Sequence, residues 1–213
     1  MRLHSLFYFV MYLFILPLLL TTLLFASDDP YLKRLIEGNK RYASDLLEHP
    51  NRTSERREAV AAKQEPFAAI LSCSDSRVSP EILFDQGLGD LFIMRVAGNV
   101  LGTLELESIL YAITYLHCRL ILVLGHESCG AVKAVLDNTI QSIPAIAKLI
   151  QPSVQKAIKM KAPYTLRTSI QQNALNMRDR LLHTKKLKPL LQKDKLHIYA
   201  GYYHLDTGEV EIL

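Results

Sequence analysis

Two clusters of reactive side chains, each directly after a short apolar run, constrain this 213-residue chain more than any other feature. Residues 73–77 read CSDSR and follow the apolar residues 68–72, and residues 126–130 read HESCG and follow residues 120–125. Short apolar runs bounded by polar residues are typical of buried strands. In an open α/β sheet, ligands bind just beyond the carboxyl ends of the strands. Both clusters therefore fall where a site is expected, and they meet if the two strands are neighbours.

Three side chains of these clusters form a ligand set suited to zinc. Cys73, His126 and Cys129 offer two thiolates and an imidazole, which are soft ligands that zinc prefers. Three protein ligands leave the fourth tetrahedral position to water, as in catalytic zinc sites. Cys118 precedes the second strand, so the length of that strand should keep it well away from the metal. We interpret Cys118 as a small buried apolar residue.

Asp75 and Arg77 lie two and four residues beyond Cys73. An ionised Asp75 beside a zinc-bound water can accept its hydrogen bond and orient its lone pair. A carboxylate can also coordinate zinc itself, and the planar guanidinium of Arg77 can hold Asp75 back while keeping it charged. Taken alone, these residues could be a turn with a surface ion pair. Their position beside the metal ligands favours the catalytic interpretation.

The rest of the chain alternates predicted helices and strands. Predicted helices cover residues 30–47, 53–64, 103–118, 130–160 and 168–193, predicted strands cover residues 67–72, 91–97 and 120–124, and residues 196–213 predict a β-hairpin that turns at residues 206–208. This alternation is typical of an α/β fold with a mostly parallel β-sheet flanked by helices. An N-terminal helical arm and a C-terminal β-hairpin complete the expected architecture.

The N-terminal segment carries an uncharged apolar stretch between Ser5 and Ser27, preceded by Arg2. Such a stretch predicts a signal peptide or an N-terminal membrane anchor over residues 1–27, with the zinc domain over residues 28–213. The domain is then exported, and is periplasmic or anchored to the inner membrane facing the periplasm. In an oxidising compartment, a Cys73–Cys129 disulfide would be the alternative to a metal site, and the protein would then be a metal-free binding or scaffolding protein.

Composition excludes several other classes. Hydrophobic residues make up 49% and charged residues 22%, which excludes a disordered chain, and three cysteines are too few for a disulfide scaffold. The net charge of +4 does not predict a nucleic-acid binder. Residues 156–195 are rich in Lys and Arg, and we interpret them as solvated helix faces rather than a lipid or nucleic-acid surface. Membrane contact is expected only through the N-terminal segment.

The chain resembles β-class carbonic anhydrases of the plant-like type, as an exported bacterial member. The matching stretches are residues 36–42 (IEGNKRY), 69–78 (AILSCSDSRV), 90–99 (DLFIMRVAGN), 123–132 (VLGHESCGAV) and, more loosely, 205–208 (LDTG). The resemblance implies a lyase that hydrates carbon dioxide reversibly to bicarbonate through zinc-bound hydroxide, with one Zn²⁺ per chain. It implies a homodimer or a larger homo-oligomer. Hydrolysis of carbonyl sulfide or carbon disulfide on the same fold remains the alternative activity.

The same resemblance assigns roles to individual residues. Cys73, His126 and Cys129 would be the zinc ligands, with Asp75 and Arg77 as the catalytic dyad. Gln64 matches a glutamine that hydrogen-bonds substrate in plant-like members. The chain has no Trp, a residue on which some bacterial members rely for bicarbonate sensing, and this favours a constitutively open site. His204 departs from an Asp that is common in the family, which puts only the contacts of the hairpin in doubt.

Overall fold

The computed structural model describes residues 29–139, 142–193 and 195–213. The predicted signal peptide or anchor, residues 1–27, lies outside the described residues. Among the helices that the structure does describe, none is long and apolar enough to cross a membrane.

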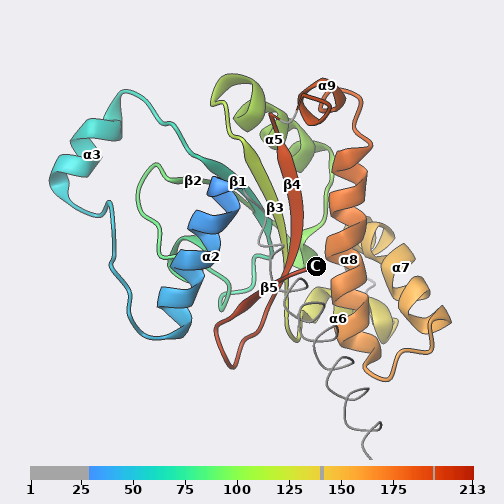
Figure 1. Cartoon of the computed structure of the whole chain (residues 1–213). Coiled ribbons are helices and arrows are strands. Elements are labelled where there is room, and N and C mark those ends of the chain that lie inside the picture. The colour runs from blue at the N-terminus through green and yellow to red at the C-terminus, as the bar shows by residue number, and fades with distance from the viewer. Residues whose placement is uncertain (1–28, 140–141, 194) are drawn as a thin grey trace, which may run out of the picture.

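A five-stranded sheet in the order β2-β1-β3-β4-β5 forms the centre of the domain (Figure 1). Its strands are β1 (Ala68–Ser72), β2 (Leu91–Arg95), β3 (Leu120–His126), β4 (His197–Tyr203) and β5 (Val210–Ile212). The first four strands pair in parallel, and β5 pairs antiparallel with β4. The predicted α/β fold, its mostly parallel sheet and its C-terminal hairpin are confirmed.

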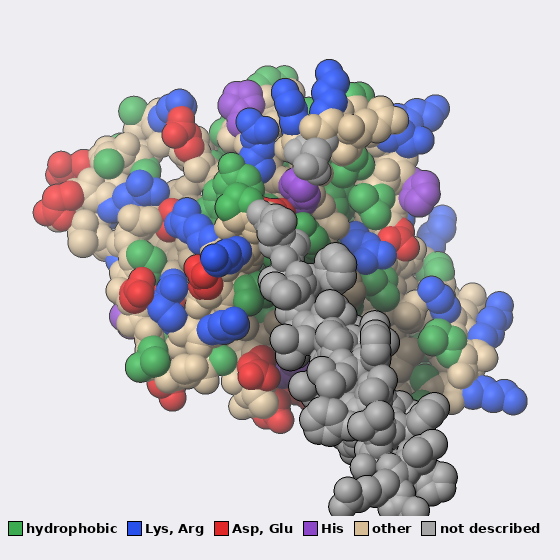
Figure 2. Space-filling view, in the orientation of Figure 1, with side chains coloured by type: hydrophobic (Ala, Val, Ile, Leu, Met, Phe, Trp, Pro, Cys, Tyr) green, Lys and Arg blue, Asp and Glu red, His purple; other side chains and the backbone are tan. Residues whose placement is uncertain are grey.

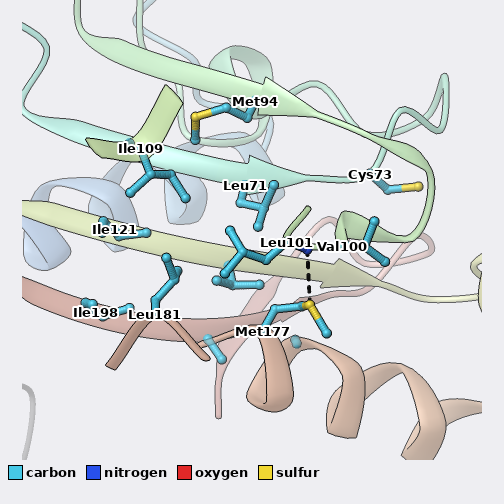
Figure 3. Close-up of a cluster of buried hydrophobic side chains, with 14 of the residues drawn as sticks. Leu71, Cys73, Met94, Val100, Leu101, Ile109, Ile121, Met177, Leu181 and Ile198 are labelled. Carbon is cyan, nitrogen blue, oxygen red and sulfur yellow. Dashed lines mark hydrogen bonds between the residues drawn. The ribbon is translucent and has the colours of Figure 1, made fainter. Parts of the chain in front are cut away.

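Helices cover both faces of the sheet (Figure 1). They are α2 (Pro30–Ala43), α3 (Ser54–Ala61), α4 (Pro80–Leu83), α5 (Thr103–Tyr115), α6 (Gly130–Leu136), α7 (Pro144–Lys159), α8 (Thr165–Leu182) and α9 (Lys188–Leu191), with a 3₁₀ turn η2 (Ala97–Asn99). Alternate residues of β1 enter two separate cores, because successive side chains of a strand point to opposite faces. Ala69 and Leu71 join the core beneath α5 to α8, part of which Figure 3 shows, whereas Ala68 and Ile70 join the core beneath α2 and α4.

The N-terminal arm begins where the sequence predicts and ends earlier. Asp29 caps α2 by accepting hydrogen bonds from two backbone N–H groups of the first turn, and Pro30 occupies the first helical position. The helix stops four residues before the predicted end at residue 47, because Asp45 adopts a left-handed φ of 56°. Leu46, which was expected on the buried face, is 70% exposed. Helix α3 buries no residue and stands away from the sheet (Figure 1).

Two long predicted helices are each divided. Residues 130–160 form α6 and α7, since Asn138 turns the chain at a φ of 58° and Pro144 starts the second helix. Residues 168–193 form most of α8 and the short α9. Ten of the eleven Lys and Arg residues between positions 156 and 195 are exposed, and Figure 2 shows basic side chains spread over this face of the molecule. Helix α4 and the turn η2 were not predicted.

Candidate metal centre

The two reactive clusters meet at one edge of the sheet, as predicted. Cys73 directly follows β1, His126 is the last residue of β3, and Cys129 is the N-cap of α6. Strands β1 and β3 are parallel neighbours, with Ser72 opposite Leu124. Their carboxyl ends therefore present the ligands to the same point.

The three candidate ligands form a compact buried group. One ligand atom from each of Cys73, His126 and Cys129 lies within 4.8 Å of the others. All three residues are at most 4% exposed. Ser128 adopts a left-handed φ of 53°, which turns the short loop so that its His and its Cys reach one place. Within the described part of the chain, no other group of three or more His, Cys, Asp or Glu residues could hold a metal ion.

The imidazole of His126 has one ring nitrogen in use and one unpaired. Its Nδ1 lies 2.9 Å from the carbonyl oxygen of Glu127, so Nδ1–H donates and Nε2 keeps its lone pair. Nε2 is buried and has no hydrogen-bond partner in the structure. Buried polar atoms are normally satisfied, and an orphaned imidazole nitrogen beside two thiols fits a metal ligand. The residues present therefore fit a zinc ion.

The two thiols change each other's pKa. Their interaction lowers the pKa of Cys73 well below its usual range, and together with burial it raises the pKa of Cys129 well above its usual range. The backbone N–H of Gly98, 3.3 Å from the Cys73 sulfur, also favours the Cys73 thiolate. A cation between the sulfurs would allow both to ionise, which is how thiolate sites release protons on binding metal. Both residues are free thiols in the structure, not the alternative disulfide.

Arg77 holds the carboxylate of Asp75 in two places. Its Nε donates to Oδ1 at 2.9 Å and its Nη2 donates to Oδ2 at 2.8 Å, while its backbone N–H also donates to Oδ1. The guanidinium holds the pKa of Asp75 well below the usual carboxyl range. Oδ2 lies 3.9 Å from Nε2 of His126. The structure therefore brings the predicted dyad beside the ligand group, with the carboxylate of Asp75 ionised and bound by Arg77.

Arg95 is a site residue that the sequence patterns did not single out. From the end of β2, its Nε donates to the carbonyl of Cys73 at 3.2 Å and its Nη2 to the carbonyl of Asp75 at 2.8 Å. These bonds fix the backbone of the loop that carries both residues. Arg95 lies inside residues 90–99, one of the stretches that resemble the family, and this was the one available signal.

Two residues lie away from the ligand group. Gln64 is exposed in the loop before β1, at the amino end of that strand, whereas Cys73 follows its carboxyl end. Within one chain the substrate role of Gln64 stays a prediction. Cys118 is buried before β3, where its Sγ donates to the carbonyl of Pro66 at 3.1 Å. Its predicted burial and its separation from the metal ligands are confirmed.

A pocket of about 440 Å³ opens beside the loop between His126 and Cys129. Its lining includes Glu127 and Ser128 from that loop and Arg167 from α8. Neither His126 nor the two thiols line it, so it flanks the ligand group rather than containing it.

Comparison with known proteins identifies the family. Residues 68–210 match the sequence profile of a family described as "Carbonic anhydrase". The fold matches the structure of the β-carbonic anhydrase CcaA with a TM-score of 0.68 at 24% identity, over 85% of this chain and 94% of that one. The chain belongs to the β-class carbonic anhydrase family. The Coccomyxa β-carbonic anhydrase gives a TM-score of 0.64, at 24% identity over 88% of this chain and 86% of that one.

Sequence relatives in this carbonic anhydrase family are more similar but match shorter stretches. "Carbonic anhydrase 2" of Mycobacterium tuberculosis is 46% identical over 128 residues, which are 57% of this chain and 62% of that protein. A carbonic anhydrase of Mycolicibacterium smegmatis is 52% identical over 105 residues, which are 49% of this chain and 51% of that protein. The chain thus spans less than two thirds of the length of these two relatives.

Proposed function

We propose that this protein is a zinc-dependent carbonic anhydrase that hydrates carbon dioxide reversibly to bicarbonate and a proton. The observation that carries the proposal is the buried ligand group with the unpaired Nε2 of His126 beside an ionised Asp75. Cys73, His126 and Cys129 would hold one zinc ion, which leaves a fourth position open. A zinc ion bound there supplies Lewis acidity that makes water an acid near neutral pH.

The chain's own residues then orient the reacting water. The positive charge of Arg77 stabilises the ionised form of Asp75, and its two hydrogen bonds orient the carboxylate. Asp75 therefore stays deprotonated and accepts a hydrogen bond from the attacking water at Oδ2. Because the two hydrogen bonds from the guanidinium fix the carboxylate plane, the lone pair of that water is aimed at substrate. Arg95 keeps the loop backbone in place during this step.

The test is stopped-flow carbon dioxide hydration by the full-length chain, with zinc per chain measured on the same sample. Fast hydration with one zinc per chain supports the proposal. Bound zinc without hydration would contradict carbon dioxide as the substrate, and carbonyl sulfide and carbon disulfide would then be tested. Absence of zinc with a Cys73–Cys129 disulfide would overturn the site.

We further propose that the chain works as a homodimer or larger homo-oligomer. In its own chain Gln64 lies at the amino end of β1 and Cys73 follows the carboxyl end, so the substrate role that the resemblance gives Gln64 would use the metal centre of another copy of the chain. A structural neighbour at 19% identity and a TM-score of 0.65 is described as one of two tetrameric β-carbonic anhydrases from Sordaria macrospora. Light scattering on the full-length chain gives the mass, and a monomer with full activity would contradict the proposal.

Export is proposed on the N-terminal sequence alone, since residues 5–27 carry no charged side chain and are mostly apolar. Cell fractionation of the C-terminally tagged full-length chain tests it. Recovery in the periplasmic or inner-membrane fraction is expected, and recovery with cytoplasmic markers would contradict it.

A further inference from the structure

One backbone N–H contacts the candidate metal ligand Cys73 from the turn η2. Gly98 donates this bond to the Cys73 sulfur at 3.3 Å, with its φ at 71° in the left-handed region. Glycine has no Cβ atom, so it adopts this region without a steric penalty. The same lack of a side chain leaves other backbone conformations open to it. The direction of the Gly98 N–H must therefore be fixed by contacts from elsewhere in the fold.

Helix α8 supplies those contacts at two points one turn apart. Asn173 donates from Nδ2 to the carbonyl of Gly98 at 2.8 Å. The backbone N–H of Leu101, two residues after the turn, lies 3.1 Å from the sulfur of Met177, and Figure 3 shows this bond. The segment from Gly98 to Leu101 is thus attached to α8 at both ends.

The same helix face is fixed against the strand that carries His126. A Cβ atom added at Gly125 would lie 3.2 Å from Cγ2 of Ile170 and 3.5 Å from Cβ of Ala174, so α8 packs closely on the end of β3. Ile170, Asn173 and Ala174 share one face of the helix, because residues three and four apart are neighbours. One face of α8 therefore contacts both the strand that carries His126 and the turn that donates to Cys73.

The side-chain amide of Asn173 forms a hydrogen bond through its amino group and none through its oxygen. Asn173 is completely buried, and its Oδ1 has no hydrogen-bond partner in the structure. A buried amide that bonds through its amino group alone is placed for the Gly98 carbonyl rather than for a general polar network.

We propose that Asn173 is a positioning residue for the metal centre. It holds the peptide groups around Gly98 so that the Gly98 N–H donates to the Cys73 thiolate, which keeps that sulfur in place and reduces its electron donation to the metal. The inference rests on the proposed function in one respect, the binding of zinc through Cys73. Partners of this kind around a metal ligand typically change metal affinity or activity about 10- to 100-fold when removed.

The experiment compares N173L with the matched control N176L in the full-length chain. Asn176 lies one turn further along α8 and donates to the hydroxyl of Ser153 at 3.3 Å, whereas Asn173 donates to the carbonyl of Gly98. Each protein is loaded with zinc to measure its release to a chelator, and with cobalt(II) to record the sulfur-to-metal charge-transfer band. In N173L we expect release about 10- to 100-fold faster, because the Cys73 sulfur is no longer held in place. We also expect a charge-transfer band at lower energy, because that sulfur no longer accepts the Gly98 hydrogen bond. N176L should match the unmodified protein.

Equal release rates and unshifted bands in both variants would overturn the inference, since a residue that only packs would change stability alone. If N173L does not fold, ¹⁵N-glycine NMR of the unmodified chain loaded with ¹¹³Cd decides. Coupling between ¹¹³Cd and the Gly98 amide proton is expected, and its absence would overturn the inference. An unmodified chain that binds neither zinc nor cobalt contradicts the proposed function instead, which separates the two failures.

Discussion

Arg77 contacts both carboxylate oxygens of Asp75, and one of these oxygens lies only 3.9 Å from Nε2 of His126. Asp75 is thus close enough to the ligand group for a modest rotation to bring it among the ligands. The guanidinium restrains that rotation with two directed hydrogen bonds.

Replacing Arg77 with Ala should therefore release Asp75 towards the metal position. We expect hydration to fall about 10- to 100-fold while one zinc per chain is retained. The matched control is Lys63→Ala, which breaks the exposed ion pair between Lys63 and Glu65. Stopped-flow rates and zinc content are measured together, and equal rates in the two variants would contradict the role of Arg77.

The three cysteines should divide into two classes by substitution with Ser. Cys129→Ser removes a ligand and should lose both zinc and hydration. Cys118→Ser should keep both, because a hydroxyl can still donate to the carbonyl of Pro66. Metal analysis after dialysis checks this, and full zinc retention by Cys129→Ser would remove that residue from the ligand set.

The pH dependence of stability should carry a contribution from Cys118. Burial raises the pKa of Cys118 to about 12, so the thiol stays neutral in the fold while the unfolded chain ionises near pH 8.5. Stability from this group is fully present below about pH 8.5 and is lost as the pH rises towards 12.

Relative to Cys118→Val, the unmodified chain should therefore lose about 1.4 kcal/mol of unfolding free energy per pH unit across this window. Urea unfolding at two pH values within it provides the comparison. A difference between the two proteins that is constant with pH would show that Cys118 ionises normally in the fold.

Two glycines near the centre should respond differently to replacement by Ala. At Gly98 the left-handed backbone costs about 1–2 kcal/mol for an L residue, and the new Cβ would lie 2.7 Å from Cδ1 of Ile150. Overpacking adds about 1–3 kcal/mol. Gly130→Ala is the control, because a Cβ added there would have nothing within 4 Å and Ala favours helix. The urea concentration at the midpoint of unfolding should fall sharply in Gly98→Ala and should stay unchanged in Gly130→Ala.

The central strands and the meeting of the clusters could be predicted because they follow from local patterns. The apolar residues before Cys73 and before His126 predict buried strands, and the carboxyl ends of parallel neighbours share one edge. The end of helix α2 could not be predicted as well, because the left-handed turn at Asp45 has no strong sequence signal.

The contacts around the ligands could not be predicted in the same way. Asn173 lies 75 residues from Gly98 and Arg95 lies 22 residues from Cys73, and each bond ends on a backbone carbonyl. Every residue has the same backbone carbonyl, so neither sequence pattern nor spacing shows which carbonyl accepts a given hydrogen bond. Gln64 was assigned by resemblance, and a single chain leaves it at the opposite end of β1 from the ligands.

The attachment of the Gly98 turn to α8 also bears on how the protein matures. All three candidate ligands are synthesised before α8, since Cys129 precedes Asn173 by a long stretch of chain. Contacts between distant segments form late, because loop closure must precede them. The thiols of a nascent chain are therefore present before α8 can order the turn around Gly98. Stable zinc uptake is expected only after α8 has docked.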